Sequence, residues 1–212
     1  ESQMVAVTVR AGSKAEMALP DGTFVHLNAA TNLEYDVNNS KQRLVKLSGE
    51  AFFDVAKNPD CPFKVIINDL QIEVVGTSFN VKTYKKDIVE TSLLSGRIRI
   101  SGGSLPHEYT LSPGQKATYS AMDRTLRISK ADAHVEAGWR DNYLIFESTP
   151  LIDVIAQIER WYGVEIRLHH KQIAQDLLSG SFRNESIQNV IRSLSIQYGF
   201  KYEIHKDIIT IY

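Results

Sequence analysis

Histidine and cysteine side chains could bind a metal or act as nucleophiles, but here they are scattered along the 212 residues. Among the six histidines only His169 and His170 are adjacent. Neighbours on a strand point to opposite faces, so this pair would not readily share one metal ion. The single cysteine, Cys61, lies in the turn-like run Asn58 to Pro62, with no helix N-terminus to stabilise a thiolate. We therefore expect no metal, no cofactor and no catalytic thiol.

Two further patterns could suggest hydrolysis. Glu50 and Asp54 are four residues apart, which on one strand places them on the same face but about 13 Å from each other. Glycosidases use carboxyl separations of roughly 5–9.5 Å. The run from Gly76 to Asn80 lacks the second glycine of a nucleophile elbow, and strand-like residues follow it. The sequence therefore predicts that this protein is not an enzyme, although carboxylates from distant strands could still converge.

Composition excludes several other classes. The hydrophobic share of 43% and the charged share of 23% are ordinary for a folded globular protein. A net charge of -1 provides no basic field for nucleic acid, so we expect no nucleic-acid partner. Apolar runs are too short to span a bilayer, and no signal peptide is present. The chain is thus expected to be either an intracellular protein or the soluble part of a longer one.

The first part of the chain consists of short segments in which apolar and polar residues alternate, separated by turn residues. Leu70, Ile72 and Val74 alternate with polar residues, which is the period of a half-buried strand. Asn68-Asp69 is a plausible hairpin turn before this strand, and Gly76 predicts a bend where the chain changes sheet. The pattern from Val5 to about Ile128 predicts a β-rich domain, either a two-sheet sandwich or a solenoid-like stack of short strands.

The last part of the chain mixes strands and helices. Ser148-Thr149-Pro150 predicts a helix start with a hydroxyl cap and proline in the first turn. Gly163 ends this helix, while Ser186 and Gly199 bound a second helix. The order strand–helix–strand therefore occurs twice, which predicts a small α/β domain with two βαβ-like units.

These patterns predict three segments. We expect an all-β domain over residues 1–131, a linker of small residues without periodicity over 132–138, and the α/β domain over 139–212.

Three blocks in fixed order carry a family resemblance: LPDGTFVHLNAATNLEY (Leu19–Tyr35), LSGEAFFDVAKNPDCPFKV (Leu47–Val65) and VVGTSFNVKTY (Val74–Tyr84). Together they resemble the FecR family, the periplasmic sensor regions of transmembrane anti-sigma regulators. The segment GWRDNYLIFESTPLIDVIAQIERWYGVEI resembles the C-terminal region of FecR-like regulators of the Bacteroidota type. The tail also looks like the secretin/TonB short N-terminal (STN) domain.

The resemblance implies a role in cell-surface signalling. A periplasmic region would bind the signalling domain of a TonB-dependent outer-membrane receptor and relay ligand status across the inner membrane. An anti-sigma domain and one transmembrane helix would precede this region, so an ECF-type sigma factor would be contacted by segments absent from this chain. Alternatives from other classes are an extracytoplasmic carbohydrate-binding β module, or a hydrolase with catalytic residues on loops.

Four residues are candidates for partner binding. Arg160 and Trp161 are expected to lie off the apolar stripe of the first helix, where tryptophan and arginine often dominate interfaces. Alternatively, Trp161 packs on the β domain. Tyr202 and Ile204 alternate with polar residues on a short strand, whose backbone is expected to lie at a sheet edge.

Overall fold

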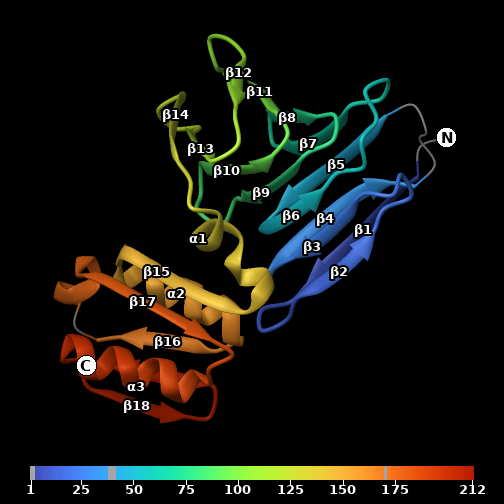
Figure 1. Cartoon of the computed structure of the whole chain (residues 1–212). Coiled ribbons are helices and arrows are strands. Elements are labelled where there is room, and N and C mark those ends of the chain that lie inside the picture. The colour runs from blue at the N-terminus through green and yellow to red at the C-terminus, as the bar shows by residue number, and fades with distance from the viewer. Residues whose placement is uncertain (1–2, 38–41, 170) are drawn as a thin grey trace. The chain divides into compact units, whose positions relative to one another are not determined.

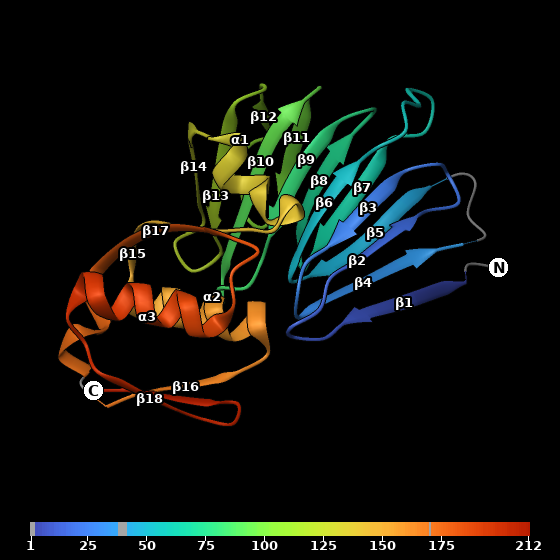
Figure 2. The same ribbon diagram turned by 60° about the horizontal axis from the view of Figure 1, so that its bottom comes forward.

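The computed structural model describes residues 3–37, 42–169 and 171–212, and it divides into two compact units (Figures 1 and 2). The first unit comprises the residues up to Val9 together with Lys14–Ala137. The second comprises Arg10–Ser13 and Gly138–Tyr212. The combination of a β-rich unit with a small α/β unit confirms the fold class predicted from the sequence.

The first unit is built from two seven-stranded sheets. The first sheet contains, in spatial order, β1 (Met4–Val9), β4 (Thr31–Asp36), β5 (Arg43–Ser48), β7 (Phe63–Ile67), β8 (Leu70–Val74), β11 (Ile98–Gly102) and β12 (Tyr109–Leu111). The second contains β14 (Thr125–Lys130), β13 (Gln115–Ser120), β10 (Ile88–Ser95), β9 (Ser78–Lys82), β6 (Glu50–Asp54), β3 (Phe24–Leu27) and β2 (Ala15–Ala18).

The chain passes repeatedly from one sheet to the other. After β5 it crosses to β6 in the second sheet and then returns to β7, which pairs with β5 in parallel. Strands β8 and β9, and later β11 to β13, repeat such crossings. Successive strands therefore wind around a shared core, which gives the solenoid-like character expected from the sequence.

Alternating side chains of both sheets fill this core. On β7 and β8 every second residue is buried, as the period-2 pattern predicts. Phe53, Phe63 and Phe79 are fully buried, with Phe53 lying 5.8 Å and 5.2 Å from the other two ring centroids. Such aromatic contacts stabilise a core beyond the burial of their area.

Two local predictions for the β unit are confirmed. Ile67 pairs with Leu70 across the hairpin, and Asn68 in the turn has a left-handed backbone with φ of 52°. Gly76 lies where the chain leaves β8 for the other sheet. A Cβ at Gly76 would lie 2.9 Å from the Cα of Lys57, so close backbone approach requires glycine there.

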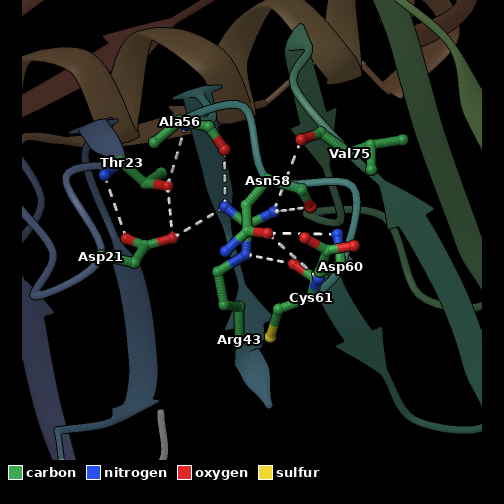
Figure 3. A network of polar contacts seen from close by, with 8 residues as sticks. All are labelled: Asp21, Thr23, Arg43, Ala56, Asn58, Asp60, Cys61 and Val75. Carbon is green, nitrogen blue, oxygen red and sulfur yellow. Dashed lines mark hydrogen bonds and ion pairs between the residues drawn. The ribbon is translucent and has the colours of Figure 1, made fainter. Parts of the chain in front are cut away.

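A buried arginine connects the loops of the β unit (Figure 3). The side chain of Arg43, at the start of β5, is only 6% exposed. Its Nε donates to the carbonyl of Cys61 at 2.6 Å, and Nη1 donates to the carbonyl of Ala56 at 2.6 Å. Nη2 donates to the carbonyls of Asn58 at 3.2 Å and Val75 at 3.5 Å. The guanidinium thus binds backbone oxygens of two separate loops.

Asp21 supplies the counter-charge from a third loop. Its Oδ2 lies 3.1 Å from Nη1 of Arg43 and also accepts from the hydroxyl of Thr23 at 2.8 Å. Thr23 in turn accepts from the backbone N–H of Ala56 at 3.3 Å. The side-chain oxygen of Asn58 accepts from the backbone N–H groups of Asp60 and Cys61. All three loops therefore belong to one polar network centred on Arg43.

The expected linker contains regular structure instead. Residues 132–138 include helix α1 (Ala133–Ala137) and the start of the 3-10 helix η1 (Gly138–Asp141). The carboxylate of Glu136 on α1 accepts from the hydroxyl of Ser92 at 3.0 Å and pairs with Lys116 at 2.8 Å. These contacts fasten α1 to the β unit, so a stretch without apolar periodicity forms a helix through tertiary contacts.

The second unit contains two small sheets and two helices. After η1 the chain forms β15 (Tyr143–Pro150), α2 (Leu151–Tyr162), β16 (Glu165–Leu168), the 3-10 helix η2 (Lys171–Gln175), β17 (Leu177–Arg183), α3 (Ile187–Tyr198), β18 (Tyr202–His205) and β19 (Ile208–Ile211). Strands β15 and β17 pair with each other, and β16, β19 and β18 form the other sheet. Both helices contribute buried side chains to a separate apolar core.

The helix boundaries follow the sequence in three of four places. Ser186 caps α3, since its hydroxyl accepts from the N–H of Asn189 at 3.2 Å, and Gly163 and Gly199 end the two helices with left-handed backbones. The predicted hydroxyl cap of α2 is wrong. Pro150 occupies the N-cap position of α2 without a side-chain hydrogen bond, because strand β15 extends through this proline.

The Arg43 network yields a stability prediction. Substituting Arg43→Met should lower the free energy of unfolding by about 3–5 kcal/mol, because the partly buried carboxylate of Asp21 and four carbonyls lose their donor. Arg99→Met is the matched control, since the side chain of Arg99 is 50% exposed, and its partner Glu73, which is 13% exposed, keeps a second cation in Lys64. It should change stability by less than about 1 kcal/mol. Equal effects of the two substitutions in urea unfolding would contradict the assignment.

Candidate partner-binding site

A pocket of about 150 Å³ opens on the second unit at the C-terminal end of α2. Its walls come from the end of α2, the start of β15 and the end of β17 with the residues that follow. They are Asn142, Leu144, Trp161, Tyr162, Phe182, Asn184 and Glu185. A pocket of this size, lined by both polar and apolar side chains, suits one side chain of a protein partner rather than a drug-sized ligand.

Hydrogen bonds fix the polar wall of the pocket. The hydroxyl of Tyr162 donates to the carbonyl of Glu185 at 2.9 Å. Burial, together with the negative charge of Glu185, raises the pKa of Tyr162 to about 12. The carboxylate of Glu185 accepts from the side-chain amide of Asn189 at 2.9 Å. The end of α2 is thereby connected to the start of α3, which makes this wall preorganised.

Two asparagines with left-handed backbones form the adjoining wall. Asn142 precedes β15 and Asn184 follows β17, with φ of 61° and 52°. The N–H of Asn184 donates to the carbonyl of Asn142 at 3.3 Å. Asparagine tolerates this conformation better than most residues, so both can turn the chain at the ends of the paired strands.

Trp161 lies at the pocket, but the sequence-based placement of its ring was wrong. The ring is half-buried and packs against the apolar core of its own unit, as does the ring of Tyr162. From the sequence, Trp161 was expected to lie off the apolar stripe of α2. The apolar face of α2 is wide enough to include both neighbouring aromatic residues at its C-terminal end. Trp161 is consequently a partly exposed aromatic residue held in a fixed position.

The other three predicted residues occupy different places. Arg160 is half-buried in the last turn of α2, and its carbonyl accepts from the N–H of Gly12 at 2.8 Å. Tyr202 and Ile204 lie on β18, which pairs only with β19 and so forms a sheet edge as expected. Tyr202 packs on the core, whereas Ile204 is 38% exposed. The structure therefore places only Trp161 at the pocket.

The backbone of β18 offers free hydrogen-bonding groups. The N–H groups of Lys201 and Tyr212 each donate to the carbonyl of the other residue, so this pair is hydrogen-bonded across the strands. Bonded and non-bonded pairs alternate in an antiparallel ladder. The register then directs the backbone groups of Tyr202 and Ile204 away from β19, toward the open edge. A second type of partner contact, strand addition, is available at this edge.

The β unit has a larger cavity of about 330 Å³ beside the Arg43 network. Cys61, the single cysteine of the chain, lines it and is partly exposed. No histidine is among its lining residues, and the guanidinium of Arg43 is engaged by Asp21 and backbone carbonyls. Among the described residues that line the cavity, the guanidinium of Arg43 is therefore already engaged by protein groups.

The residues considered for catalysis serve other contacts. Glu50 is buried, and its carboxylate accepts from the side-chain amides of Asn28 at 2.8 Å and Asn80 at 2.9 Å. Asp54 is exposed and accepts from Ser78. Across residues 3–37, 42–169 and 171–212, no three His, Cys, Asp or Glu side chains cluster as metal ligands would. His169 lies 5.1 Å from the Tyr212 ring, while its neighbour His170 is outside the described residues.

Comparison with known proteins identifies the family. Two family models match the chain: FecR protein over residues 5–99, and FecR, C-terminal over residues 143–211. Two crystal structures of a candidate anti-sigma factor from Parabacteroides distasonis ATCC 8503 are each 30% identical with a TM-score of 0.89. One alignment covers 98% of both chains and the other covers 99% of both. A search of curated proteins found no match.

The chain belongs to the FecR family. The resemblance carried by the three sequence blocks and the C-terminal segment is thereby confirmed. The likeness of the second unit to an STN domain stays a prediction. None of the helices in the described part of the chain is long and apolar enough to cross a membrane.

Tyr162 gives a test of the pocket wall. Tyr162→Phe should lower the free energy of unfolding by about 1 kcal/mol at pH 8, because the carbonyl of Glu185 loses its donor. Burial favours the neutral phenol, so the stabilisation is complete below the ordinary pKa of 10 and is lost as pH rises toward 12. The stability difference between wild type and Tyr162→Phe should therefore shrink over this range in urea titrations. A difference that stays constant up to pH 12 would disprove the assignment.

Proposed function

We propose that this chain is the extracytoplasmic signal-receiving region of a sigma-factor regulator, and that it works through protein–protein contact rather than catalysis. The observation that carries the proposal is the match of both units to FecR family models, together with the whole-length likeness to a candidate anti-sigma factor. The side chains considered for catalysis make structural contacts, which agrees with a regulatory role.

The proposed partner is the periplasmic signalling domain of a TonB-dependent outer-membrane receptor. In this proposal the region lies in the periplasm and belongs to a protein anchored in the inner membrane. An ECF-type sigma factor would be bound on the cytoplasmic side by other segments of that protein. Ligand loading of the receptor would change the contact in the periplasm and so change the availability of the sigma factor.

Two features of the second unit suit such a partner. The pocket at Trp161 can take an apolar side chain, with Phe182 and Leu144 on its walls. Buried aromatic anchors of this kind dominate binding energies in protein interfaces. The open edge of β18 provides backbone groups at Tyr202 and Ile204 that could pair with a strand of the receptor domain.

The alternative of a carbohydrate-binding module is less well supported. Such modules bind sugars on exposed aromatic platforms. Trp139 is only 6% exposed, and Trp161 is half-buried at the end of α2. Of the two tryptophans, Trp139 therefore provides no stacking surface and the half-buried Trp161 provides only part of one.

Calorimetric titration with receptor periplasmic signalling domains from the same organism tests the proposal. Trp161→Ala should weaken binding by about 2 kcal/mol, roughly 30-fold, because the pocket loses its largest wall. Ile196→Ala is the matched control, since Ile196 is 75% exposed on α3 of the same unit and lies outside the pocket. Its affinity should equal that of the wild type.

Stability must be measured on the same variants. Trp161 is half-buried against its core, so Trp161→Ala should also lower the melting temperature while the protein remains folded at 25 °C. Ile204→Pro gives a second probe, because it removes an outward N–H of β18 without breaking the ladder with β19. If both variants bind the receptor domain as the wild type does, the site does not lie on this unit.

A further inference from the structure

Strand β14 is an uncovered edge of the β unit. It ends the second sheet, and among the described strands it pairs only with β13. Five of its six residues are exposed, and the other, Leu126, is half-buried. Ile128 keeps 41% of its surface exposed, although β-branched apolar residues usually lie inside a sandwich. Strand β14 therefore extends beyond the covered part of the core.

The register of β14 shows which of its backbone groups lack a partner. The N–H of Ala131 donates to the carbonyl of Gly114 at 2.9 Å, just beyond the end of the strand. Because bonded pairs alternate in an antiparallel ladder, the next bonded residues on this strand are Ser129, Arg127 and Thr125. The N–H and C=O groups of Leu126, Ile128 and Lys130 then point away from β13. They form a row that can bind one further strand.

The charge of this edge is of one sign. Arg124, Arg127 and Lys130 lie on or beside β14, and the strand itself carries no acidic residue, although Asp123 and Asp132 flank the segment from 124 to 131. None of the three cations forms an ion pair with a described residue. On the neighbouring strand, by contrast, Lys116 pairs with both Glu90 at 3.1 Å and Glu136 at 2.8 Å. The cations of β14 are thus available to an anionic partner.

The two faces of β14 differ in polarity. Leu126 and Ile128 lie opposite the buried residues Tyr119 and Ala117, so they face the interior of the sandwich. Arg127 lies opposite Thr118 and faces outward. The end strand of the other sheet, β12, has only three residues. An added strand could place apolar side chains beside Ile128 on the inner face and acidic side chains beside Arg127 on the outer face.

We propose that the edge of β14 is a docking site for an extended acidic segment of a partner protein, which adds to the second sheet as an eighth strand. Backbone bonds to Leu126, Ile128 and Lys130 provide the attachment, and the cations select for acidic residues. A second copy of this chain fits less well, because pairing two β14 strands would bring three cations from each copy onto the same edge. This inference concerns the β unit and does not depend on the proposed receptor contact of the α/β unit.

Hydrogen exchange tests the geometry of the edge. In the free protein the amides of Leu126, Ile128 and Lys130 should exchange at least tenfold faster than those of Arg127 and Ser129, which bond to β13. Adding an acetylated octapeptide of alternating glutamate and valine should slow the first three amides by tenfold or more. Slow exchange of these amides without peptide would show that the edge is already paired and would overturn the proposal.

Fluorescence titration with the labelled octapeptide tests its selectivity. Arg127→Glu should weaken binding at least tenfold, and raising the salt concentration should weaken wild-type binding. An octapeptide of alternating lysine and valine should bind at least tenfold more weakly than the acidic one. Equal affinity for the two peptides would mean that the cations do not select the partner, which would overturn the proposal.

Proline substitution separates strand addition from simple charge attraction. Ile128→Pro removes an outward N–H without breaking the ladder with β13, and it should weaken peptide binding at least tenfold. Ala18→Pro is the matched control, because Ala18 is an exposed, outward residue of β2 at the opposite edge of the same sheet. It should bind the peptide as the wild type does.

The remaining outcomes are equally decisive. Acidic-peptide binding that survives Ile128→Pro in a folded variant would overturn the proposal. A dimer that is seen by sedimentation and is dissociated by Ile128→Pro would also overturn the proposal, because the edge of β14 would then bind a second copy of this chain. If Ile128→Pro does not fold, the exchange measurement and Arg127→Glu together decide the question, and failure of either to respond to the acidic peptide rejects the site.

Discussion

The β unit depends on one buried charge, the guanidinium of Arg43, which holds three loops at a single point. A buried guanidinium is costly unless its donors are satisfied, so these loops must be in place together for the fold to be stable. The FecR-like sequence blocks supply its partners. Asp21 comes from the first block, Cys61 and its neighbours from the second, and Val75 from the third. The three blocks therefore contribute structurally by supplying the partners of Arg43, which itself lies between the first and second blocks.

Acidic residues elsewhere in the β unit also act structurally. The carboxylate of Glu50 is held by two asparagine amides, which lie on and beside the neighbouring strands of its sheet. Lys82 and Lys116 outweigh the effect of burial and lower the pKa of Glu90, so Glu90 stays ionised in a partly buried place. Glu136 uses the same lysine to fasten α1. These carboxylates therefore contribute to the stability of the β unit by joining its strands and by fastening α1.

Both units have open sheet edges, and the proposed contacts with partner proteins use these edges. Winding the chain between two sheets gives the middle strands a neighbour on both sides but leaves β14 with one open side. In the α/β unit, β18 is likewise open along one side, and the small pocket lies at the end of α2. Strand addition obtains affinity from the backbone and selectivity from alternate side chains. Such surfaces suit a regulator whose partners are other proteins.

The sequence by itself determined the features that depend on a few neighbouring residues. The turn at Asn68-Asp69, the bend at Gly76 and the cap at Ser186 are set by local backbone preferences and could be predicted. Tertiary structure decided the rest. Helix α1 has five residues, too few to be stable alone, and forms because Glu136 binds Ser92 and Lys116. The pocket at Trp161 and the network around Arg43 join residues from distant segments of the chain. They could not be predicted from the sequence, because the stability of such contacts depends on burial and on partners that a local sequence pattern does not encode.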